Sequence, residues 1–107
     1  SITILNYKKD YRHSYNIKNI SDALASKANI TFAGIIKTKK IIKTKKGEPM
    51  AFVKVFDDNN EMESVLFPEA YSKSLMDIEI NNVVIIEGRN DGKGAFIANE
   101  LKLLKED

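Results

Sequence analysis

The chain of 107 residues contains no cysteine and no tryptophan, and only two prolines and five glycines. Without cysteine it can form neither a disulfide framework, nor a thiolate zinc site, nor a cysteine nucleophile. No apolar run approaches the roughly 18 residues that span a bilayer, and residues 1–20 lack the uninterrupted apolar core of a signal peptide. These absences predict an intracellular, cytoplasmic protein without membrane segments.

What the chain does contain is typical of one folded domain, with 43% hydrophobic and 30% charged residues. Its net charge is only +2, but residues 37–46 carry +6 with no acidic residue, so the remainder carries −4. The lysines of this window are Lys37, Lys39, Lys40, Lys43, Lys45 and Lys46. Such a local basic field attracts polyanions, although a solvated lysine strand that resists edge-to-edge aggregation would look the same.

The first 29 residues are polar and show no strand alternation. Tyr7, Tyr11 and Tyr15 recur every four residues, which predicts one packing face of a helix. Ser21 and the residues after it predict a short capped helix, and the lone His13 is expected at the surface. We interpret residues 1–29 as a connector or docking segment.

From Ile30 onward, β-branched runs alternate with turn signals. Strands are expected at residues 30–43, 50–56, 61–67, 83–88 and 95–104, with a helix over residues 68–75 that has proline at its first position. Gly34 predicts a bulge or sharp coil in the first strand, and the Asp-Asp-Asn-Asn run at 57–60 predicts a tight turn.

Three strands, a helix and two strands is the element order of a five-stranded oligonucleotide/oligosaccharide-binding (OB) barrel. The fold prediction is therefore a mainly β OB-fold barrel over residues 30–107, with the helix between the third and fourth strands. A short, partly helical N-terminal segment precedes it, and the isolated domain is expected to be monomeric.

In this fold the ligand lies across the second and third strands, between the loop joining strands one and two and the loop joining strands four and five. On the second strand Phe52 alternates with core residues beside Lys54, so a base-stacking surface would adjoin a phosphate contact. Phe56 is a weaker candidate because it adjoins the acidic turn. The predicted nucleic-acid-binding residues are Lys37, Lys39, Lys43, Lys45, Lys46, Phe52, Lys54, Arg89 and Lys93.

The acidic cluster is Asp57, Asp58, Glu61 and Glu63, which fits a hairpin turn better than a divalent-metal site. There is no Ser/His/Asp arrangement and no glycine-rich phosphate loop ahead of a helix. The sequence thus predicts a non-catalytic domain that needs no cofactor.

Several segments resemble the OB domain of the bacterial replicative DNA polymerase III alpha subunit. The segments are KKGEPMAFV at 45–53, FPEAY at 67–71, EGR at 87–89, ITFAGII at 30–36 and FIANEL at 96–101. The resemblance implies a sequence-nonspecific module that holds single-stranded template DNA within a longer polymerase chain. It also implies contacts with other domains and replisome subunits, and it places catalytic magnesium in a different domain. The alternatives are a protein-interaction module of the replisome and a tRNA anticodon-binding OB domain.

Overall fold

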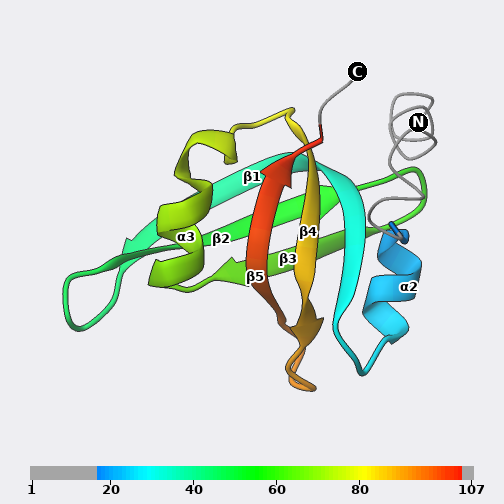
Figure 1. The fold of residues 1–107 in the computed structure, drawn as a ribbon, viewed down its shortest axis with the longest axis horizontal. Coiled ribbons are helices and arrows are strands. Elements are labelled where there is room, and N and C mark those ends of the chain that lie inside the picture. The colour runs from blue at the N-terminus through cyan, green and yellow to red at the C-terminus, as the bar shows by residue number, and fades with distance from the viewer. Residues whose placement is uncertain (1–16, 105–107) are drawn as a thin grey trace.

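The computed structural model describes residues 17–104, so the tyrosine repeat and His13 lie outside the described residues. The elements, in chain order, are α2 (Ile20–Ala25), β1 (Ile30–Lys43), β2 (Pro49–Phe56), β3 (Glu61–Leu66), α3 (Pro68–Ser74), the 3-10 helix η1 (Leu75–Asp77), β4 (Val83–Asn90) and β5 (Phe96–Leu103). The predicted order of three strands, a helix and two strands is confirmed (Figure 1).

The strands close into a barrel in the order β1-β2-β3-β5-β4. β1 closes it because its first part, Ile30–Ile35, pairs with β4, whereas Ile35–Lys43 pairs with β2. All of these pairings are antiparallel except the short parallel contact between β3 and β5. A closed five-stranded barrel with a helix between the third and fourth strands is the OB-fold, so the predicted fold is confirmed.

Alternation along β2 separates the barrel core from an outer face. Ala51, Val53 and Val55 are fully buried, while Phe52, Lys54 and Phe56 on the outer face are half-buried, as the alternation predicts; Met50 on that face is buried. Ile36 and Leu66 join the same core. Ile85 is also buried, but in a separate cluster with Ile17, Ala33 and Leu104.

Of the two alternatives predicted for Gly34, a bulge or a sharp coil, the bulge is wrong. The register of β1 against β2 shifts between Ile36 and Thr38, so Lys37 is the extra residue. Glycine at 34 instead permits close packing, because a Cβ there would lie 3.1 Å from the Cβ of Val55. The position of the bulge matters for the outer face, because one extra residue in β1 changes which of the following lysines point outward.

The short N-terminal helix begins earlier than predicted, because Asn19 rather than Ser21 caps it. The Asn19 side chain accepts from the Asp22 N–H at 2.9 Å, and Asp22 accepts in turn from the Asn19 N–H at 3.3 Å. Ile20 and Ala23 are buried in the main core, so α2 packs against the barrel. Within residues 17–104, no helix is long and apolar enough to cross a membrane.

Candidate nucleic-acid interface

Strand register brings five side-chain positions into line across the outer face of the barrel. Lys40 pairs with Phe52, Phe52 with Val65, Val65 with Ile97, and Ile97 with Arg89. We call Lys40, Phe52, Val65, Ile97 and Arg89 the transverse row. It runs over β1, β2, β3, β5 and β4 with a cation at each end and apolar side chains between them.

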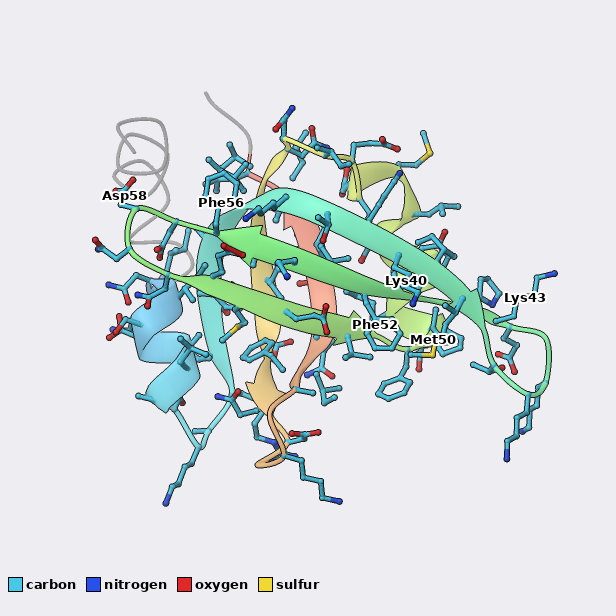
Figure 2. All side chains as sticks on the ribbon, turned by 180° about the vertical axis from the view of Figure 1, so that it is seen from behind. Lys40, Lys43, Met50, Phe52, Phe56 and Asp58 are labelled. Atoms are coloured by element: carbon cyan, nitrogen blue, oxygen red, sulfur yellow. The ribbon has the colours of Figure 1, made fainter. Side chains whose placement is uncertain are left out.

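The aromatic ring in this row is accessible and has a cation beside it. Phe52 is half-buried and projects from the outer face near Lys40 and Met50 (Figure 2). Val65 lies opposite it on β3 and is itself buried. Such an arrangement offers a flat apolar surface for a base next to a contact for its phosphate.

The loop between β1 and β2 carries two further cations beyond the barrel. The hairpin projects away from the barrel (Figure 1) and closes through hydrogen bonds from the Thr44 N–H to the Glu48 carbonyl (2.8 Å) and from the Gly47 N–H to the Thr44 carbonyl (2.9 Å). Gly47 has φ of 80°, a conformation that glycine adopts without strain. Lys45 and Lys46 are both exposed on this loop.

The loop between β4 and β5 is organised by Asp91. Its Oδ1 accepts from the Lys93 N–H at 2.6 Å and from the Ala95 N–H at 3.1 Å. The bond from the Lys93 N–H, then that from Ala95, holds the pKa of the Asp91 carboxyl below its usual value. The loop and the segment before β1 border a groove of about 660 Å³, whose lining includes Lys27, Arg89 and Ile97. Lys93 is exposed on this loop.

The remaining predicted lysines divide between the two sides of β1 and β2. Lys54 is on the outer face and pairs in register with Glu63. Lys37 forms an ion pair with Glu61 at 3.0 Å.

Lys39 is opposite the inward residue Val53, and its Nζ donates to the Ile78 carbonyl at 3.2 Å. Lys43, opposite Pro49, shares that side, so Lys39 and Lys43 point away from Phe52.

The acidic turn at the other end of β2 is fixed by backbone hydrogen bonds. Asp57 accepts from the N–H groups of Asn59 and Asn60, both at 3.0 Å, and from the Ile20 N–H at 2.9 Å. The turn therefore holds the start of α2 against the barrel. Among residues 17–104 there is no group of three or more His, Asp or Glu side chains suited to a metal ion.

Sequence reasoning missed three members of the transverse row. Lys40 belongs to the lysine window but not to the predicted binding set, and Val65 and Ile97 carry no polar signal. The hairpin register alone would have found Lys40, because Lys43 opposite Pro49 places Lys40 opposite Phe52. Val65 and Ile97 depend on the parallel pairing of β3 with β5, which brings together distant parts of the chain.

No protein-family model matches the chain. Curated relatives are nevertheless found, and they confirm the resemblance seen in the sequence. DNA polymerase III subunit alpha of Pseudomonas aeruginosa is 34% identical over 58 residues, which are 54% of this chain and 5% of that protein. The protein of the same name from Aquifex aeolicus is 29% identical over 83 residues, 78% of this chain and 7% of that protein. The chain thus matches only a small part of these long relatives.

Solved structures share the fold at low sequence identity. A domain of replication protein A from Methanococcus maripaludis superposes with a TM-score of 0.64 at 15% identity, covering 84% of this chain and 97% of that one. A mitochondrial single-stranded DNA-binding protein from S. cerevisiae gives 0.61 at 12% identity, covering 77% and 99%. Asparaginyl-tRNA synthetase of Entamoeba histolytica also gives 0.61, at 18% identity, covering 85% and 23%. Likeness of fold alone therefore does not select a function.

Proposed function

We propose that this domain binds single-stranded DNA, without base specificity, across the outer face of β1, β2 and β3. The observation that carries the proposal is the transverse row, in which an accessible phenylalanine on β2 lies beside Lys40 of β1 and in line with Arg89 of β4. The curated relatives named DNA polymerase III subunit alpha support a role in replication. A structural neighbour named as a single-stranded DNA-binding protein supports the ligand.

The physical division of labour follows from the side chains. One base stacks on Phe52, which contributes about 1–3 kcal/mol and accepts any base because every base has a π-face. Lys40 and Lys54 flank that ring and contact phosphates, while Lys45 and Lys46 hold the strand at the β1–β2 loop. Arg89 and Lys93 do the same at the β4–β5 loop. The remaining lysines of the predicted set, Lys37, Lys39 and Lys43, add to the local positive field.

The same proposal places the domain in a longer chain. Since the match covers 5% to 7% of the curated relatives, we propose that it acts within a bacterial replicative polymerase in the cytoplasm. There residues 30–107 would hold template DNA, residues 1–29 would connect to other domains, and magnesium-dependent nucleotide transfer would occur elsewhere. The acidic turn gives no reason to assign catalysis here, because Asp57 is engaged with backbone N–H groups.

Fluorescence anisotropy tests this proposal with four labelled ligands: oligo-dT, oligo-dA, a DNA duplex and tRNA. We expect both single strands to bind alike and the duplex to bind more weakly. If Lys40, Lys45, Lys46 and Lys54 each neutralise a phosphate, log affinity should fall with log salt with a slope of about −2.8, and contacts by Arg89 and Lys93 would make it steeper. That slope corresponds to a roughly 50-fold loss between about 50 and 200 mM salt. No binding at low salt would contradict the proposal, and a strong preference for tRNA would favour an anticodon-binding domain instead.

A further inference from the structure

The second half of β1 has one edge without a neighbouring strand in the described part of the chain. β4 pairs with β1 only as far as Ile35, and Ile36 is covered by hydrogen bonds with Asn81 and Asn82. From Lys37 to Ile41 every residue is exposed, and Lys43 is exposed as well. The free edge therefore runs along the lysine window, next to the hairpin that extends beyond the barrel (Figure 2).

Hydrogen-bonded and non-bonded residue pairs alternate along the two hairpins. This alternation determines which residues of β1 direct their backbone N–H and C=O groups toward the free edge. The Asp57 N–H bonds to the Asn60 carbonyl, and the Thr44 N–H bonds to the Glu48 carbonyl. In antiparallel pairs, bonded positions alternate with non-bonded ones. Residues 38, 40 and 42 therefore bond to β2, whereas Lys39, Ile41 and Lys43 direct their N–H and C=O groups to the free edge. Pro49, opposite Lys43, fits this assignment: proline has no N–H to donate, and position 49 is a non-bonded position of the β1–β2 pair.

The side chains of these three edge residues lie on one side of the strand. Ile41 keeps 43% of its surface exposed, and it stands between Lys39 and Lys43. Lys39 donates to the Ile78 carbonyl at 3.2 Å and lies 3.4 Å from Glu79 in an exposed ion pair; the ion pair is weak, so an acidic group of a ligand can replace Glu79 while the bond to Ile78 remains. Lysines on an edge repel a second basic strand, and by the same electrostatics they select an acidic one.

We propose that the free edge of β1 binds an acidic, extended peptide segment, which adds to the barrel as an antiparallel strand opposite Lys39, Ile41 and Lys43. Main-chain hydrogen bonds would supply affinity and the alternating side chains specificity. The complementary pattern is an acidic residue, any residue, an aliphatic residue, any residue and a second acidic residue. The two acidic side chains would meet the lysines, and the aliphatic one would cover Ile41.

This site is separate from the proposed DNA surface. Lys40 and Phe52 lie on the outer face, whereas the peptide would lie along the strand edge with its recognised side chains on the opposite side. One domain could therefore hold single-stranded DNA and an acidic protein segment at the same time. The peptide proposal does not depend on DNA binding, so the two can fail independently.

The test is an NMR titration of the ¹⁵N-labelled chain, at low salt, with the capped peptide Thr-Glu-Thr-Val-Thr-Glu-Thr. We expect chemical-shift changes and slower hydrogen exchange at the amides of Lys39, Ile41 and Lys43. A matched pair of peptides isolates strand pairing: N-methylation at Val, which faces β1, should weaken binding at least tenfold. N-methylation at an adjacent Thr, which faces away, should change it little. Equal binding of the two methylated peptides would overturn the proposal, as would shifts centred on Phe52 and Val65.

Variants of the protein give a second measurement. Ile41→Pro removes the central edge N–H without removing a bond to β2, so it should abolish peptide binding while oligo-dT binding is retained. Ile41→Thr keeps the N–H and should keep most of the affinity. Lys43→Glu and Lys40→Glu make the same change of charge on opposite sides of the strand. Lys43→Glu should weaken the peptide at least fivefold more than Lys40→Glu, and equal losses would show that only the general field attracts it.

Discussion

The two ends of β2 each carry a phenylalanine on the same outer face, but they differ in the charge around that phenylalanine and in how the backbone is held. At the loop end, Lys40 lies beside Phe52 and Lys54 is the next outward residue of β2, and the hairpin extends past the barrel (Figures 1 and 2). At the turn end, Phe56 adjoins Asp57 and Asp58, and Glu61 lies opposite it. The same residue type, phenylalanine on an outward position of one strand, therefore stands in a positive field at one end and a negative field at the other.

The difference extends to the backbone. The loop at residues 44–48 is closed mainly by its own hydrogen bonds and carries its lysines into solvent. The turn is tied through Asp57 to the first N–H of α2, a residue 37 positions away in the sequence. The loop end thus has the charge and exposure to hold a ligand, whereas the turn end holds the fold together.

The largest effect expected concerns the turn. Asp57→Ala removes the acceptor for the N–H groups of Ile20, Asn59 and Asn60, so the free energy of unfolding should fall by about 1–3 kcal/mol. Urea denaturation measures this loss. Asp57→Asn can keep one oxygen as acceptor for Asn59 and Asn60 but turns an NH2 group toward the Ile20 N–H, so it should lose less stability than Asp57→Ala without matching the wild type. An alanine variant that unfolds at the wild-type urea concentration would show that the turn does not hold α2.

The second effect distinguishes the two phenylalanines. Phe52→Ala should cost about 1–3 kcal/mol of oligo-dT affinity because a stacked base loses its partner. Its salt slope should stay unchanged, since stacking releases no counterions. Phe56→Ala is the matched control and should cost clearly less, because the acidic turn repels the phosphates beside it. Equal losses in anisotropy titrations would remove the functional distinction between the two ends.

The sequence was sufficient for the order of the elements and the facing of β2. Both depend on local signals: two-residue alternation, Pro68 at the start of α3 and the polar run at 57–60. The charge contrast along β2 also follows from sequence, because the lysines and carboxylates flank it in separate blocks.

The choice among the lysines required the register of β1 against β2, which charge and alternation do not give by themselves. Counting back from the β1–β2 loop places Lys40 opposite Phe52 and Lys39 opposite Val53, but the extra residue Lys37 ends this count at Thr38. Without that register, the predicted site contains Lys39, which points to Ile78, and omits Lys40. Arg89 meets Ile97, and Val65 meets Ile97, only because distant strands close the barrel.

The third prediction measures the loop end by its salt dependence. Replacing Lys45 and Lys46 together by alanine should reduce the magnitude of the slope of log affinity against log salt by about 1.4, because two phosphate contacts are lost. Replacing Lys18 and Lys102, two exposed lysines outside this loop, should reduce it less. An unchanged slope in the loop variant would place the nucleic acid elsewhere on the barrel.

The smallest effect concerns the carboxylate nearest the predicted path of the single-stranded DNA. Glu63 faces outward opposite Lys54 and repels a phosphate that approaches this lysine. Glu63→Gln should therefore tighten oligo-dT binding by about 0.5 kcal/mol at low salt, which is the size of an exposed ion-pair interaction. The gain should shrink as salt is raised, because exposed charges are screened. Glu100→Gln removes the same charge from β5, where Glu100 lies 3.4 Å from Lys102, and it provides the control. An equal gain in both variants would mean that affinity depends only on the net charge of the domain. The bound DNA would then not run past Lys54 toward the acidic turn.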